Sequence, residues 1–131
     1  MISEATAAFL AEPLPIVVGS LRGNGQVKLT PAWFEFRDGL FWLNSRRGTH
    51  WLGHLERARR ATLLLIDPHD MYRVVHAETR LAGTTTEGAG AHLDRLSHRY
   101  RGEPYRALAP MTRVIVRLEP LAVRSTLDGR P

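Results

Sequence analysis

The chain has 131 residues, the size of one domain, and its 44% hydrophobic residues are enough to fill a core. It contains no cysteine, which excludes disulfides, thiolate chemistry and cysteine-based zinc sites. The formal net charge is +5, but the 18 basic residues are all arginine except Lys28 and are scattered from Arg22 to Arg130. This charge therefore indicates attraction for small anions and does not favour a nucleic-acid partner.

The N-terminus predicts a short amphipathic helix and not a targeting segment. The apolar stretch Ala5–Ala11 is short, follows Glu4 and lacks a basic flank, and Ser3 can serve as an N-cap. We place this helix within residues 1–12. Elsewhere no run approaches the ~18 apolar residues of a membrane span. Together with the absence of cysteine, this predicts a cytoplasmic protein without a membrane partner.

Two hairpins are predicted in the first third of the chain. Gly23-Asn24-Gly25 separates a strand at 16–21 from a strand at 26–37, because these turn residues accept positive φ at little cost. A second tight turn separates that strand from a third one at 40–44. Pro31 interrupts the second strand and indicates an edge, a bulge or a bend there.

The remaining elements complete a mainly β chain. Periodicity and turn residues predict a helix from about Trp51, strands at 61–66, 71–85 and 112–119, and a helix that ends at Gly102. The polar tail, residues 125–131, is expected to be loose. Six strands, two or three helices and no βαβ alternation predict one α+β domain over residues 1–131, an antiparallel barrel that is closed or partly closed.

The stretch from Asn44 to Arg57 gives the strongest indication of a binding site. A basic turn opens a helix, whose start presents unpaired backbone N–H groups and the positive end of the dipole. Arginine side chains there can bind a phosphate or a carboxylate. The helix has two faces at helical spacing, an apolar one (Trp51, Leu52, Leu55, Ala58) and a basic one (Arg47, His50, His54, Arg57). A solvated basic face is the alternative interpretation.

The sequence contains no familiar catalytic motif. It lacks a GxGxxG followed by a helix, GxxxxGK[ST], HExxH and GxSxG, and Ser45 has no evident base partner. His50 and His54 are spaced for a shared metal, but no third ligand is spaced to join them, so we predict no metal site. Catalytic residues are left unassigned, and if the protein is an enzyme, a bound cofactor carries the chemistry.

Four parts of the chain, in their order and spacing, resemble one known family. They are Val27–Phe34, which contains Thr30-Pro31-Ala32-Trp33-Phe34; Leu40–Arg47; Asp67–Val75; and a C-terminal third with Leu93–Leu96, Tyr100–Tyr105 and Arg113–Pro120. The resemblance covers about residues 3–124. It is to the split-barrel flavin and deazaflavin oxidoreductases, the pyridoxamine 5′-phosphate oxidase-like superfamily, and within it to short members that use coenzyme F420.

This resemblance implies a six-stranded antiparallel split barrel of the FMN-binding type, and a homodimer with cofactor sites at the subunit interface. The cofactor phosphate would lie against the turn and helix start, contacted by Ser45, Arg46, Arg47 and Thr49. The ring system would lie along Thr30, Pro31 and Trp33 and beside Leu64 and Leu65, with Tyr72 and Arg73 contributed by the neighbouring chain.

The chain departs from the family pattern where the helix opens. Many members have Lys-x-Arg-Asn-Leu there, whereas this chain has Trp51-Leu52-Gly53-His54-Leu55. Two cations are lost, each able to make charge-assisted bonds worth about 1.5–3 kcal/mol; Arg46, Arg47 and His50 would compensate. Trp51 either stacks on an aromatic ligand or packs the helix against the barrel. We predict that His50, Trp51 and His54 also belong to the cofactor-binding residues.

We therefore predict an oxidoreductase that transfers hydride between reduced coenzyme F420 and a small unsaturated substrate. Two alternatives stay open, an FMN-binding protein of the same fold and a non-catalytic barrel that binds a flavin or haem. The missing cations favour FMN, which needs only a compact phosphate site, whereas the segment pattern favours the deazaflavin.

Overall fold

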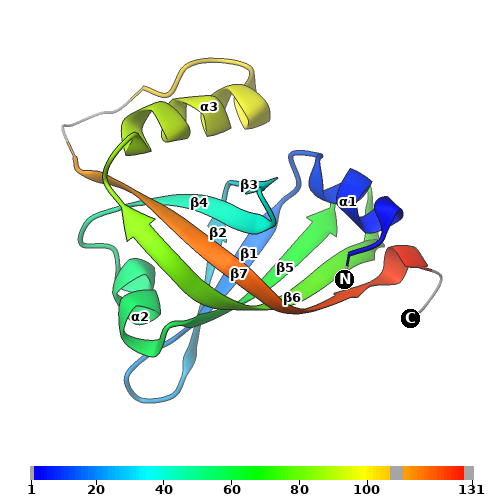
Figure 1. Ribbon diagram of the computed structural model, residues 1–131, viewed down its shortest axis with the longest axis horizontal. Helices are drawn as coiled ribbons and strands as arrows, with labels where there is room; N and C mark the ends of the chain where they lie inside the picture. The colour runs from blue at the N-terminus through cyan, green and yellow to red at the C-terminus, as the bar shows by residue number, and fades with distance from the viewer. Residues whose placement is uncertain (1, 107–110, 129–131) are drawn as a thin grey trace.

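The computed structural model describes residues 2–106 and 111–128. Within these residues the chain forms seven β-strands, three α-helices and one 3-10 helix (Figure 1). The strands are β1 (Ile16–Leu21), β2 (Val27–Ala32), β3 (Phe34–Arg37), β4 (Leu40–Arg46), β5 (Arg60–Asp67), β6 (Asp70–Thr85) and β7 (Arg113–Ser125). The helices are α1 (Glu4–Leu10), α2 (His50–Ala58) and α3 (Ala89–Arg101), and the 3-10 helix is η1 (Thr126–Asp128).

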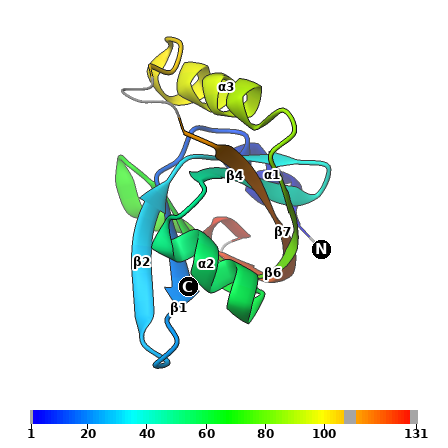
Figure 2. The same cartoon turned by 90° about the vertical axis from the view of Figure 1, so that its left-hand side faces the viewer.

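All seven strands belong to one antiparallel sheet with the order β2-β1-β5-β6-β7-β4-β3. Its two edge strands, β2 and β3, are separated in the chain only by Trp33. The sheet must therefore curl until its edges approach each other, and the result is the predicted barrel of antiparallel strands with short helices. The views in Figures 1 and 2 show this curvature, with the helices placed around the sheet.

The strand predicted over residues 26–37 is divided into β2 and β3, which raises the strand count from six to seven. The break falls at Trp33 and not at Pro31. Pro31 is accommodated within β2 because β2 is an edge strand, where a missing N–H leaves no ladder position unpaired. Both predicted hairpins are present, since β1 pairs with β2 and β3 pairs with β4.

The inner face of the sheet carries the core. Along β1 and β5 every second residue is buried, from Ile16 and Val18 to Ala61, Leu63 and Leu65. The residues of β5 that alternate with these are only half-buried, although the run 61–66 is almost continuously apolar. The outer face of β2, β1, β5 and β6 is thus partly apolar and uncovered within one chain.

The helices lie at different edges of the barrel. Figure 2 shows α2 beside β1 and β2, with α3 at the opposite end of the barrel wall. In Figure 1, α1 and η1 lie away from α2. No helix within residues 2–106 and 111–128 is long and apolar enough to cross a membrane.

The two ends of the described chain are joined to each other. Ser3 caps α1 as predicted, because its Oγ accepts a hydrogen bond from the Thr6 backbone N–H at 3.1 Å. The same Oγ donates to Asp128 Oδ1 at 2.6 Å. The predicted loose tail begins later than residue 125, since Ser125 ends β7 and η1 follows it. Residues 129–131 of that tail lie outside the described residues.

Candidate functional site

The turn between β4 and α2, which we call the arginine turn (residues 45–49), has a fixed shape. Gly48 has a φ of +94°, a conformation that other residues adopt only with strain. Ser45 is buried, and its Oγ lies 2.7 Å from Thr49 Oγ1. Thr49 is the N-cap residue of α2, but its hydroxyl contacts Ser45 and makes no capping bond. The first N–H groups of α2 therefore stay available to an anion.

Three arginines lie in or beside this turn in the fold. Arg46 and Arg47 are exposed, and Arg113 on β7 lies opposite Arg46 in the β4–β7 pairing. Arg113 is half-buried, and its Nε donates to Asn44 Oδ1 at 2.8 Å. Within the described part of the chain none of the three forms an ion pair with a carboxylate. Positive charges without a carboxylate partner favour the binding of an anion.

Burial lowers the pKa of Arg113, and the charge of Arg46 lowers it further. The Arg113 Cζ also lies 5.8 Å from the centre of the Tyr105 ring. Sequence patterns did not identify Arg113 as a site residue. The only signal was an arginine at the start of the last strand, and its position beside Arg46 depends on which strand pairs with β4.

A second group of basic side chains adjoins the arginine turn along α2. We call it the basic cluster, and its members come from α2, from the end of β1 and from β2: His50, His54, Arg57, Arg22 and Lys28. His54 is half-buried, and its Nδ1 lies 2.9 Å from Ser20 Oγ on β1. Burial lowers the pKa of His54, and the four other members of the cluster lower it further. The basic face predicted for this helix therefore faces the β1–β2 hairpin and is not simply solvated.

Thr30 lies on the face of β2 that is turned toward α2. In the β1–β2 register Thr30 pairs with Val18 and Lys28 pairs with Ser20, the residue that contacts His54. The Thr30 Oγ1 is buried and has no hydrogen-bond partner within the described residues. A buried hydroxyl without a partner costs about 1–3 kcal/mol, so this atom indicates a ligand contact.

The other predicted residues of the ring region have different surroundings. Pro31 is exposed on the outer side of β2, and Leu64 is half-buried on the outer face of β5. Trp33 is stacked on Tyr100 of α3, with ring centroids 5.4 Å apart and planes at 14°. Tyr100 is held by its hydroxyl, which donates to the Leu14 carbonyl at 2.7 Å. Trp33 therefore joins the sheet edge to α3, and its ring has one face covered.

Trp51 is a core residue. Only 7% of its surface is exposed, and it packs in the main hydrophobic cluster with Leu52 and Leu55. Of the two interpretations made from sequence, packing of the helix against the barrel is the one observed within this chain. Gly53, the other position where a cation is missing, is exposed, and a Cβ placed there would meet no neighbouring atom within 4 Å.

Tyr72 and Arg73 lie far from the arginine turn within one chain. They follow the β5–β6 turn, which Figure 1 places near α1 and away from α2. Arg73 forms an ion pair with Asp67, and its Cζ lies 5.2 Å from the Phe9 ring of α1. Tyr72 is 79% exposed and makes no side-chain contact of this kind. These residues can reach a site at α2 only on another copy of the chain.

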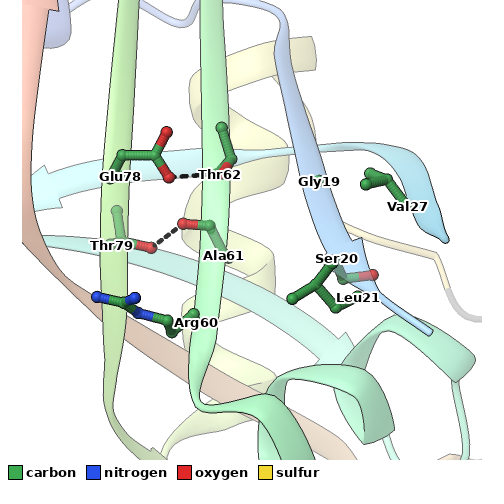
Figure 3. Close-up of a pocket in the computed structure, with 9 residues that line it drawn as sticks. All are labelled: Gly19, Ser20, Leu21, Val27, Arg60, Ala61, Thr62, Glu78 and Thr79. Atoms are coloured by element: carbon green, nitrogen blue, oxygen red, sulfur yellow. Dashed lines mark hydrogen bonds between the residues drawn. The ribbon is translucent and has the colours of Figure 1, made fainter. Parts of the chain in front are cut away.

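An open hollow of about 420 Å³ lies where β1 and β5 diverge. Figure 3 shows the residues that line it. The pairing of the two strands ends at Gly19 and Thr62. Because Gly19 has no side chain, the space between Val27 and Thr62 is left open. Glu78 on β6 accepts a hydrogen bond from Thr62 Oγ1 at 2.7 Å at its rim. Sequence reasoning did not predict this hollow.

Histidine and carboxylate side chains do not assemble a metal site in the part of the chain that the structure describes. His50 and His54 instead belong to the basic cluster, where their neighbours are arginine and lysine.

The curled antiparallel sheet with short helices at its edges has the architecture of a split barrel. The family model described as pyridoxamine 5′-phosphate oxidase matches residues 2–127. The chain therefore belongs to this family of flavin-type oxidoreductases, as the resemblance of its segments predicted.

Solved structures share the fold. An F420 reductase superposes with a TM-score of 0.84 at 19% identity, over 94% of this chain and 98% of the other. A conserved hypothetical protein of Mycobacterium tuberculosis has a TM-score of 0.74 at 24% identity, over 100% and 90% of the two chains. A FAD-binding protein of Mesorhizobium loti has 0.67 at 13%, over 89% and 88%. No curated protein sequence matches the chain.

Proposed function

We propose that the protein is an oxidoreductase that uses coenzyme F420 and transfers hydride between the reduced cofactor and a small unsaturated substrate. The observation that carries this proposal is the extent of the basic surface. It begins at the arginine turn and continues along α2 from His50 to Arg57, a length of ~10 Å at 1.5 Å per residue. FMN has one phosphate, whereas the acidic tail of F420 would use the whole length.

The residues fit such a cofactor. Arg46, Arg47 and Arg113, which have no carboxylate partner within the described chain, would hold the phosphate together with the N–H groups at the start of α2. The Thr30 hydroxyl would gain the partner it lacks by contacting the ring system. The cofactor supplies the hydride chemistry, and the protein contributes binding, orientation and a surface that excludes water.

The charges missing from the start of α2 are replaced from other elements. Where many relatives have a lysine, this chain has Trp51, which is buried, and where they have an arginine it has Gly53, which is exposed. Arg113 from β7 brings a cation beside Arg46, and Lys28 from β2 brings one beside His54. These cations on the strands would replace, for an acidic tail, the two cations that are missing from the helix.

FMN is the second candidate. The arginine turn is compact and offers backbone and hydroxyl groups as well as charge, which is all that a single phosphate needs. In that case the basic cluster along α2 would contribute little to affinity. Binding of a flavin or haem without turnover would instead identify the protein as a carrier.

We also propose a homodimer with the site at the interface. Apolar side chains are exposed on β2 and on the β5–β6 hairpin, with Val27 at 56%, Leu29 at 69%, Met71 at 71% and Tyr72 at 79%. A second copy covering this face would bury them and bring Tyr72 and Arg73 to the partner's site. Sedimentation at micromolar concentration should give twice the chain mass of 14.7 kDa. A monomer would contradict the interfacial site.

Parallel titrations test the cofactor. Coenzyme F420, FMN and haem are each titrated into the protein and followed by absorbance and fluorescence, at low and at high salt. We expect saturable binding of F420 that is tighter than that of FMN and weakens steeply with salt, because several charges contribute. Equal affinity for FMN and F420 would favour the compact site, and no saturable binding of any of the three would refute the oxidoreductase proposal.

A further inference from the structure

His54 is half-buried, and its side chain forms one hydrogen bond within the described residues, to Ser20. It lies in the middle of α2, half-buried between this helix and β1. Its Nδ1 is 2.9 Å from Ser20 Oγ, and its Nε2 forms no hydrogen bond or ion pair within the described residues. The ring is therefore held by its Nδ1, and its Nε2 is available to a ligand.

The charges that act on His54 are all positive. Arg57 and His50 lie on the same face of α2, Arg22 follows β1, and Lys28 lies on β2. Glu56 is two residues further along the helix, about 200° around its axis, and is exposed on another side. No carboxylate among the described residues balances the charge that His54 would gain, so protonation of its ring is disfavoured in the free protein.

We propose that His54 takes up one proton when an anion binds to the basic cluster. This inference rests on the proposed function, since the anion would be the acidic part of the cofactor, and it adds that cofactor binding is coupled to pH. The proton comes from solvent and completes the imidazolium. Nδ1–H then donates to Ser20 Oγ, and Nε2–H becomes available to the anion.

The sign of the coupling follows from the charges. In the free protein, burial and four cations lower the pKa of His54. A bound anion offsets those cations, so the pKa of His54 is higher in the complex. Affinity is then greatest below the pKa of the free protein and is lost as the pH rises through the pKa of the complex. Between these two values, one linked proton raises Kd by up to about tenfold per pH unit.

Two measurements test this inference. In the first, coenzyme F420 is titrated calorimetrically at one pH near 6.5 in MES, PIPES and imidazole buffers, and the dependence of the observed enthalpy on the buffer gives the number of protons taken up. In the second, NMR follows the titration of the His54 ring in sulfate and in chloride at equal ionic strength. Sulfate does not titrate near neutral pH, so any proton must come to the protein.

Three variants accompany the wild type: His54→Gln, His50→Gln, and His98→Gln as a control on α3, where His98 is exposed. We expect proton uptake in the wild type and in the His98 variant, and uptake near zero in His54→Gln. Sulfate should raise the titration midpoint of His54. Uptake that persists in His54→Gln and disappears in His50→Gln would assign the proton to His50 and overturn the inference.

The outcomes separate this inference from the proposed function. Binding of F420 without proton uptake would refute the role of His54 and leave the cofactor proposal intact. A raised His54 midpoint in sulfate, with no binding of F420, would support the proton uptake and refute the proposed cofactor. If sulfate leaves the midpoint unchanged and F420 does not bind, both are wrong.

Discussion

A buried histidine on α3 makes this protein sensitive to acid. His92 is 1% exposed and lies between two polar side chains of the β3–β4 hairpin. Its Nδ1 is 3.0 Å from Asn44 Nδ2, a group that can only donate, and its Nε2 is 3.2 Å from Glu35 Oε1, without the alignment of a hydrogen bond. Because Asn44 Oδ1 is engaged by Arg113, the amide cannot turn over without losing that contact. A proton on Nδ1 would therefore face another donor.

The lowered pKa of His92 gives the size of the expected loss of stability in acid. Burial lowers the pKa of His92 from 6.5 to about 4, against the opposing charge of Glu35. A group whose pKa is lower in the folded state gives stability that is present above pH 6.5 and is lost as the pH falls toward 4. At about 1.4 kcal/mol per pH unit, His92 accounts for about 3 kcal/mol over this interval.

Urea unfolding measured between pH 4 and 7.5 gives the free energy of unfolding at each pH. We expect the wild type to lose about 3 kcal/mol more than His92→Gln between pH 6.5 and 4, because glutamine can accept from Asn44 and does not titrate. Burial would raise the pKa of Glu35, but Arg95, with smaller contributions from His92 and Arg37, lowers it overall. The part of this shift that comes from Arg95 is common to both proteins. His98→Gln, on the exposed side of α3, should follow the wild type. Parallel curves for the wild type and His92→Gln would refute the argument.

Three further changes test the site and its support. Replacing Arg46 and Arg47 together by Ala should weaken binding of F420 or FMN by tenfold or more in a fluorescence titration, whereas Arg101→Ala at the end of α3 should not; an unchanged Kd would mean that the pair are surface charges. Thr30→Val should leave the free energy of unfolding unchanged or raise it by up to about 1 kcal/mol, while weakening cofactor binding; a clear loss of stability would mean that the hydroxyl already has a partner. Trp51→Ala should cost about 3–5 kcal/mol in urea unfolding, and a much smaller cost would contradict its place in the core.

The hairpins and the barrel could be predicted because their signals are local. Gly23-Asn24-Gly25 marks a turn whatever the rest of the chain does, and the alternation along β6 and β7 gives each strand one buried face. The division at Trp33 could not be predicted in the same way. Whether residues 26–37 form one strand or two depends on which neighbours their two halves pair with, and β1 and β4 lie at opposite sides of the sheet order.

The candidate site was predictable to the extent that it lies on one element. Helical spacing identified the basic face with His50 and His54, because residues three and four apart share a face. Arg113 from β7 lies beside Arg46, and Lys28 from β2 lies beside His54, and the spacing of these residues in the chain does not predict either position. Periodicity identifies residues that share a face of one element, so it cannot predict charges that strand pairing brings together.

Trp51 fixes the helix that carries the proposed anion site. A lysine at the second residue of α2 would stay at the surface, whereas the tryptophan is buried with Leu52 and Leu55 and fixes the helix on the barrel. The first turn of α2 then presents its N–H groups from a rigid position, while Arg113 supplies charge from a strand that is itself held by the sheet. A site built in this way depends less on flexible cations of the helix and more on the packing beneath it. Loss of Trp51 should therefore weaken anion binding together with stability, although its side chain contacts no anion.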